Sequence, residues 1–212
     1  MAMFQGHSLA CHRGGRTVFA GLGFALERGE ALLLRGSNGS GKSSLLRVLA
    51  LLTPLRTGSL EWAGGRVDED RDAHRSRLRF LGHADALKPA LTVRENLDFA
   101  ARLADPDIAD SGIDRALELV GLDGLAALPA RLLSAGQRRR LALARLAASA
   151  GELWLLDEPG TGLDAASLRR LHELIADHRR AGGIVIASTH GDLAPPGART
   201  LDLDALAEVA ES

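Results

Sequence analysis

The sequence predicts an α/β fold with a mostly parallel core sheet, an antiparallel N-terminal β subdomain and a helical insertion. Continuous apolar runs at 153–156 and 184–187 are typical of strands buried on both faces of a parallel sheet, and a helical pattern at about 165–180 lies between them. Short strand-like pieces separated by glycines open the chain. From residue 92 to 149 apolar residues instead recur at helical spacing.

These patterns indicate one domain over the 212 residues. We expect residues 1–85 and 150–212 to form the α/β core with its β subdomain, and about 86–149 to form a helical subdomain.

Composition narrows the classes of protein that are possible. Hydrophobic residues make up 46% and charged residues 25%, and the net charge of −1 gives no reason to expect nucleic acid as a partner. Cys11 is the only cysteine, so intramolecular disulfides and a four-cysteine zinc site are excluded. No apolar stretch approaches the roughly 18 residues that span a bilayer, and no signal-peptide pattern begins the chain. We expect a cytosolic protein, or one held on a membrane by a partner.

The N-terminal elements follow from strand and turn signals. Strand-like pieces at 8–11, 17–19 and 24–27 are separated by glycine-rich turns at 14–15 and 21–23, which favours an antiparallel start.

The following segments alternate between buried strands and connections. We expect a strand at 31–34, a helix at 43–52, a strand at 59–62, a charged loop at 66–77 and a strand at 78–81.

Two signals define the later helices. Thr92 and Glu95 have the spacing of a capping box at the start of the helical insertion. A short helical pattern at 204–211 ends the chain.

The segment between the 31–34 strand and the following helix has the spacing G-x-x-x-x-G-K-[ST] of a P-loop. Backbone N–H groups of such a loop surround phosphate oxygens, its lysine reaches the outer phosphates and its hydroxyl binds Mg²⁺. A glycine-rich turn is the alternative, but it would not require one of only two lysines among 26 basic residues. The expected phosphate-binding residues are Gly36, Ser37, Asn38, Gly39, Ser40, Gly41, Lys42, Ser43 and Ser44.

Asp157 and Glu158 follow the buried 153–156 strand, at the end where ligands gather in open parallel sheets. Asp157 is the expected Mg²⁺ partner together with Ser43, and Glu158 is the expected residue that orients and deprotonates an attacking water. An Asp-Glu pair after a strand is more often a solvated turn. The neighbouring P-loop reverses that preference.

The run Leu-Ser-Ala-Gly-Gln at 133–137 closely resembles the signature motif of ATP-binding-cassette (ABC) ATPases. Ser134 is suited to cap the helix that begins near Gln137, and Gly136 lets backbone N–H groups approach an anion. A capped helix is the simpler interpretation of this run alone, and the arginines at 138–140 are expected on its polar face.

The resemblance continues in order through Asp157-Glu158, Thr161-Gly-Leu-Asp164 and His190. It implies ATP and Mg²⁺ as cofactors, and a homodimer in which Ser134, Gly136 and Gln137 of one subunit cover the ATP on the P-loop of the other. It also implies that Asp164 lies at this dimer interface, and that His190 contacts the γ-phosphate and holds the attacking water.

Two positions differ from the family pattern. Where the family usually has a glutamine that contacts Mg²⁺, this chain has His83, and imidazole is a poor match for a hard cation. His83 is therefore expected to act through water or in coupling to a membrane partner. Where many relatives stack an aromatic residue on adenine, Arg13 offers a planar guanidinium; a solvated turn arginine is the alternative.

These features resemble one subfamily, the ATP-binding subunits of the cytochrome c maturation system, often called the haem exporter. The shared segments are Leu-Gly-His at 81–83, Leu-Lys-Pro at 87–89, Leu-Thr at 91–92 and Glu-Asn-Leu at 95–97.

The resemblance implies an ATPase on the cytoplasmic face of the inner membrane, peripheral and bound to an integral membrane channel subunit. It implies that ATP hydrolysis powers release of a haem-loaded periplasmic chaperone. The alternatives are the ATPase of another exporter, for a drug or a peptide, a soluble ABC protein, or a nucleotide-binding regulator without turnover.

Overall fold

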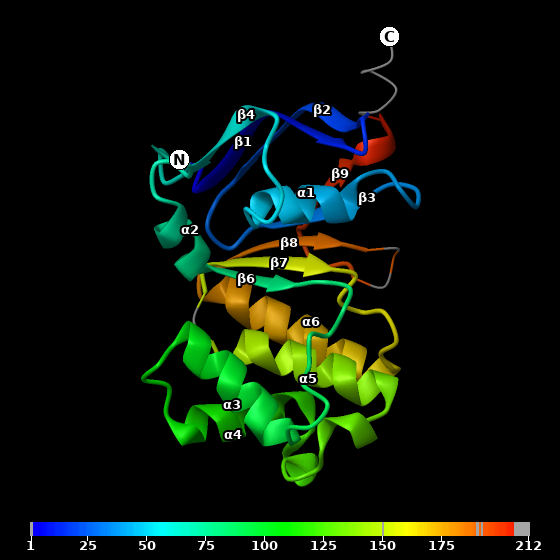
Figure 1. The fold of residues 1–212 in the computed structure, drawn as a ribbon. Coiled ribbons are helices and arrows are strands. Elements are labelled where there is room, and N and C mark those ends of the chain that lie inside the picture. The colour runs from blue at the N-terminus through cyan, green and yellow to red at the C-terminus, as the bar shows by residue number, and fades with distance from the viewer. Residues whose placement is uncertain (1, 150, 190, 192, 206–212) are drawn as a thin grey trace.

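The computed structural model describes residues 2–149, 151–189, 191 and 193–205. An antiparallel sheet of order β2-β1-β4-β5 lies above a parallel sheet of order β6-β7-β8-β3-β9. Helix α1 lies between the two sheets, α5 and α6 cover the other face of the parallel sheet, and α3 and α4 form an outer layer (Figure 1). The predicted α/β fold class is confirmed. The exact limits of the helical subdomain stay a prediction.

The antiparallel sheet is built from β1 (Phe4–Arg13), β2 (Arg16–Leu26), β4 (Thr57–Trp62) and β5 (Gly65–Arg66). The predicted turn at 21–23 is wrong, because β2 runs through it and pairs with β1 on both sides. Gly21 has a φ of 67° and the register shifts nearby, so the glycines form an irregularity within one strand.

The parallel sheet contains β3 (Ala31–Arg35), β6 (Leu78–Leu81), β7 (Leu153–Asp157), β8 (Ile184–Ser188) and β9 (Arg199–Asp202). Every residue of β7 and β8 is buried, as the apolar runs predict. Strand β9 was not predicted; it pairs in parallel with β3 at the sheet edge. Because all five strands are parallel, the carboxyl ends of β3, β6, β7 and β8 lie along one edge of the sheet.

The helices are α1 (Lys42–Leu49), α2 (Arg71–Arg77), α3 (Val93–Ala104), α4 (Asp110–Val120), α5 (Ala135–Ala147) and α6 (Ala165–Arg180), with short 3₁₀ turns η1 (Asp123–Leu125) and η2 (Ala130–Leu132). The charged loop predicted at 66–77 is wrong over α2. Asp70 caps this helix by accepting from the Ala73 N–H at 2.9 Å, and the buried His74 Nε2 bonds to the Leu49 carbonyl at 2.9 Å. The buried His74 side chain and the Asp70 cap therefore order a segment whose other residues are mostly charged.

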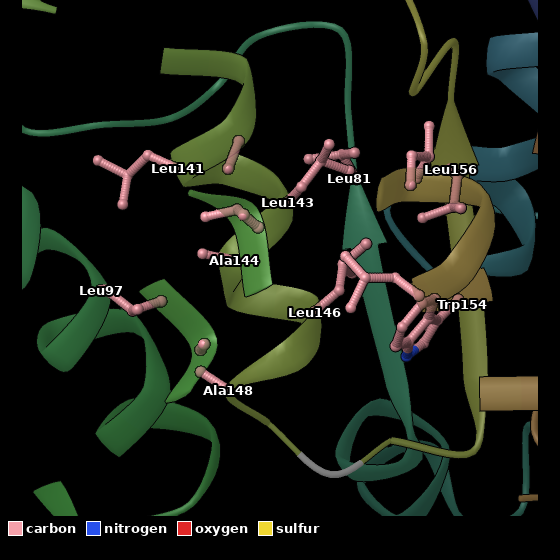
Figure 2. Close-up of a cluster of buried hydrophobic side chains, with 14 of the residues drawn as sticks. Leu81, Leu97, Leu141, Leu143, Ala144, Leu146, Ala148, Trp154 and Leu156 are labelled. Carbon is pink, nitrogen blue, oxygen red and sulfur yellow. The ribbon is translucent and has the colours of Figure 1, made fainter. Parts of the chain in front are cut away.

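Two hydrophobic cores fill the two faces of the parallel sheet. In the cluster of Figure 2, α5 lies against the sheet, with Leu146 beside Trp154 and with Leu97 of α3 on its other side. Fully burying one such leucine contributes about 1.5–3 kcal/mol. Helix α5 is therefore held firmly on the sheet. Within the described part of the chain, every helix is too short or too polar to span a bilayer.

Candidate active site

Lys42 closes the loop between β3 and α1 on itself. Its side chain is buried, and its Nζ donates to the carbonyl oxygens of Gly36 at 2.8 Å and Ser37 at 2.9 Å. An ammonium group has three donors, so one remains for a ligand inside the loop.

The start of α1 is built to face an anion. Gly41 precedes it with a φ of 103°, and a Cβ there would lie 2.7 Å from the Val18 side chain, so only glycine fits. Among the described residues, no side chain caps the first N–H groups of α1. The buried Ser40 Oγ also lacks a hydrogen-bond partner within the described chain. Unsatisfied donors around a lysine fit a phosphate group.

Asp204 fixes the outer side of the same loop, which the sequence did not reveal. Its carboxylate accepts from the Ser37 N–H at 2.7 Å and from the Ser37 Oγ at 2.9 Å. The Ser37 N–H is thereby turned away from the lysine, while the Ser37 carbonyl faces it.

Ser43 and Asp157 meet as predicted. The Ser43 Oγ donates to the Asp157 Oδ1 at 3.0 Å, and Ser188 at the end of β8 donates to the same oxygen at 2.8 Å. Asp157 is buried, and the two hydroxyl groups provide the hydrogen bonds that a buried polar oxygen needs. A hydroxyl and a carboxylate are oxygen ligands of the kind that Mg²⁺ prefers, so these residues fit the ion.

Glu158 follows Asp157 in a strained conformation. Its φ is 49°, in the left-handed region, and its N–H donates to the Ser188 Oγ at 2.9 Å. The Thr161 hydroxyl donates to Glu158 Oε2 at 3.4 Å. Glu158 and the P-loop line one cleft of about 520 Å³. The structure therefore brings the predicted base to the predicted phosphate site.

Arg13 lines this cleft as well. It lies at the end of β1, near Arg16 at the start of β2, and both side chains are exposed. This placement agrees with a contact between Arg13 and the adenine end of a bound nucleotide.

His83 lies apart from the cleft lining. It is exposed, and the pairing of Leu81 with Leu156 places it beyond the end of β6, on the same sheet edge as Asp157. Its metal role stays a prediction. No group of three or more His, Cys, Asp or Glu side chains in the described residues has the geometry of a metal site. A cation on Ser43 and Asp157 would therefore take its other ligands from phosphate and water.

The signature residues begin α5. Ser134 and Gln137 form a reciprocal capping box, with bonds of 3.2 and 2.8 Å. A Cβ on Gly136 would lie 3.3 Å from the Gly162 carbonyl, so glycine lets this turn approach the segment after β7. None of these residues lines the cleft that holds Lys42.

His190 and Asp164 are the remaining predicted site residues. His190 lies outside the described residues. Asp164 caps α6 by accepting from the Ser167 N–H at 2.7 Å, and this bond lowers the pKa of Asp164. The dimer contact expected of Asp164 stays a prediction.

Arg139 corrects one expectation. The run 138–140 was predicted to lie on the polar face of α5, but Arg139 is 5% exposed. Its guanidinium bonds to main-chain carbonyls on both sides of Glu158, because the helix turns this side chain toward the sheet.

The fold and this site together define a nucleotide-binding ATPase of the cassette class. The family model described as "ABC transporter" matches residues 19–161, and the chain belongs to this family. It is an ABC-type ATPase that binds nucleotide.

Two bacterial proteins and one solved structure are similar to nearly the whole chain. The chain is 54% identical to the cytochrome c biogenesis ATP-binding export protein CcmA of Paramagnetospirillum magneticum, over 98% of this chain and 97% of that protein. It is 54% identical to the protein of the same name from Rhodospirillum rubrum, over 96% and 86%. In fold it is similar to a solved putative ABC transporter ATP-binding protein from Pyrococcus furiosus, with a TM-score of 0.85, 22% identity, and coverage of 97% of this chain and 99% of that one.

Proposed function

We propose that this chain is the ATP-hydrolysing subunit of a haem export complex in cytochrome c biogenesis, where it powers release of a haem-loaded chaperone. The observation that carries the proposal is the 54% identity, over nearly all of both chains, to a protein named for ATP-binding export in that process. The site supports it, because phosphate-binding and hydrolytic residues converge on one cleft.

In the proposed cycle, residues 36–44 bind the phosphates of ATP and Lys42 directs its third N–H to the outer phosphates. Ser43 and Asp157 would hold Mg²⁺, which supplies charge neutralisation at the phosphates when bound. Glu158 accepts the proton of the attacking water. His190 is assigned the contact to the γ-phosphate, and Arg13 the contact to adenine.

A second copy of the chain completes the site. Ser134, Gly136 and Gln137 are assigned to cover the nucleotide on the partner's P-loop. The support is their position: these residues begin α5 and do not line the cleft of their own chain. Turnover then depends on closure of a homodimer around two nucleotides.

The complex is assigned to the inner membrane, with this chain peripheral on the cytoplasmic face. An integral membrane channel subunit would bind the chain directly, and a periplasmic haem chaperone would act across the membrane. His83 is assigned a role in coupling to the channel subunit, with any contact to Mg²⁺ made through water.

The test is affinity purification through a tag on this chain from solubilised membranes, comparing wild type with Lys42→Ala. We expect both to retain the channel subunit. Haem-loaded chaperone should accumulate on the complex only in the variant, because Lys42 is needed for ATP use. Normal chaperone release by Lys42→Ala would refute the haem pathway. Co-purification of an unrelated permease would instead indicate another exporter.

A further inference from the structure

Arg139 is a buried cation that binds main-chain oxygens almost exclusively. Its Nη2 donates to the carbonyls of Asp157 at 2.9 Å and Glu158 at 2.7 Å, and its Nε donates to the Pro159 carbonyl at 3.3 Å. Its Nη1 donates to the Gly82 carbonyl at 3.0 Å and to Asp85 Oδ1 at 3.3 Å. One guanidinium therefore joins three segments of the chain: α5, the turn after β7 and the segment after β6.

The three consecutive carbonyls control the direction of Glu158. The Asp157 carbonyl belongs to the peptide before the Glu158 Cα, and the Glu158 carbonyl belongs to the peptide after it. Fixing both peptides fixes the Cα–Cβ bond between them, and hence where the carboxylate can reach. This matters because Glu158 has a φ of 49°, a strained conformation that persists only when its surroundings impose it.

The geometry requires an arginine. A planar guanidinium presents five N–H donors in a fixed fork, and this one uses its Nη2, Nη1 and Nε on acceptors in two separate segments. A lysine would keep the charge but present its donors from one point. It could not hold the carbonyls of Gly82, Asp157 and Glu158 together.

Arg139 also links these segments to the start of α5. It lies two residues beyond Gln137, in the second turn of the helix that Ser134 caps. One side chain therefore connects the start of α5 to the peptides around Glu158.

We propose that Arg139 is a positioning residue for hydrolysis, which sets the direction of the Glu158 carboxylate and ties it to the signature turn and to the segment after β6. The proposal rests on the role assigned to Glu158 under the proposed function. Arg139 lines no part of the nucleotide cleft, so it affects turnover and not nucleotide binding.

The test compares ATP hydrolysis by Arg139→Lys and by wild type, each as the purified full chain. Both are measured at protein concentrations where the hydrolysis rate per chain no longer changes with concentration. We expect kcat per nucleotide-binding site to fall about tenfold or more, since small misplacements of reacting groups can cost up to ~100-fold. KM for ATP should stay within about twofold. Titrating the binding sites with a fluorescent ATP analogue corrects for any misfolded fraction.

Arg145→Lys is the matched control. Arg145 is also a partly buried arginine of α5, but its guanidinium donates to the Ala86 carbonyl, away from Glu158. Its kcat per site should equal that of wild type.

An unchanged kcat per site in Arg139→Lys, or a rise in KM that accounts for the whole effect, would overturn the proposal. Glu158→Gln separates this outcome from failure of the proposed function. If Glu158→Gln is inactive while Arg139→Lys is normal, only the inference about Arg139 fails; if Glu158→Gln is active, the role of Glu158 itself is wrong.

Discussion

At the scale of single residues, Asp204 supports the P-loop from outside the nucleotide cleft. Its two bonds to Ser37 hold the turn whose carbonyls receive Lys42. Hydrogen bonds to a charged group contribute about 1.5–3 kcal/mol, more than the repulsion between this partly exposed carboxylate and the phosphates, which solvent screens. We therefore expect Asp204→Ala to weaken ATP binding about tenfold, measured as the Kd of a fluorescent analogue.

A double-mutant cycle with Ser37→Ala shows whether Asp204→Ala weakens ATP binding through the lost bonds to Ser37 or through a wider change in the structure. If Asp204 acts through Ser37, the Ser37 change should have little further effect once Asp204 is removed. Tighter ATP binding by Asp204→Ala would show that charge repulsion outweighs the anchoring.

The residues of the candidate site differ in how far the sequence could predict them. Ser43 and Asp157 were predicted because local spacing and strand ends encode them. Asp204 lies 167 residues from Ser37, and no local pattern links the two. Arg139 did leave a signal: with Ala142, Leu143 and Leu146 it occupies i, i+3, i+4 and i+7 of one buried helix face.

At the scale of elements, two helices begin with the same device. Thr92 and Glu95 cap α3, and Ser134 and Gln137 cap α5, each as a reciprocal capping box. Removing such a cap costs about 1 kcal/mol. We expect Ser134→Ala and Thr92→Ala to lower the free energy of unfolding by similar amounts, measured by urea denaturation.

Of the two capping residues Thr92 and Ser134, only Ser134 is assigned a role across the dimer, so only Ser134→Ala should lower the rate of phosphate release beyond its effect on stability. Thr92→Ala is the control for the loss of a cap alone. Equal rates in the two variants would mean that Ser134 serves merely to begin a helix.

The elements that the sequence predicted share strong patterns. The strands β7 and β8 are continuously apolar, and the Thr92 cap has a recognisable spacing. Helix α2 and strand β9 lack such patterns, because both are short and largely exposed and are ordered by tertiary contacts. The glycines of β2 indicated a turn because their spacing does not distinguish a turn from an irregular strand.

At the scale of the whole molecule, His178 makes stability depend on pH. Its ring stacks on Trp154 with centroids 3.9 Å apart, between α6 and β7, and burial lowers its pKa to about 4. The folded state therefore excludes a proton that the unfolded chain binds below a pKa near 6.5. The contribution of neutral His178 to the free energy of unfolding is fully present above pH 6.5 and is lost as the pH falls toward 4.

Between pH 7 and pH 5 we expect the free energy of unfolding to fall by about 1–2 kcal/mol through His178, after discounting for its partial exposure. Urea denaturation at both pH values measures this change. His178→Phe keeps the stacking and should make the dependence less steep, leaving the part due to the buried His74, whose pKa is also lowered by burial. His12→Gln, at an exposed site, should leave the dependence unchanged. If the free energy of unfolding of His178→Phe falls as steeply with pH as that of wild type, groups other than His178 cause the pH dependence.

The separation of the signature turn from the cleft of its own chain has a consequence for assembly. If Ser134 and Gly136 complete the partner's site, two chains must close around ATP before Glu158 acts. Glu158→Gln removes the base but leaves Lys42, Ser43 and the P-loop intact, so ATP should bind and the closed dimer should persist. We expect light scattering with ATP to show a stable dimer of Glu158→Gln and a transient one of wild type. Lys42→Ala in the same background should remain monomeric, because the nucleotide that joins the subunits no longer binds. A Glu158→Gln variant with near-normal phosphate release would contradict the role of Glu158, and one that binds ATP but stays monomeric would contradict the composite site.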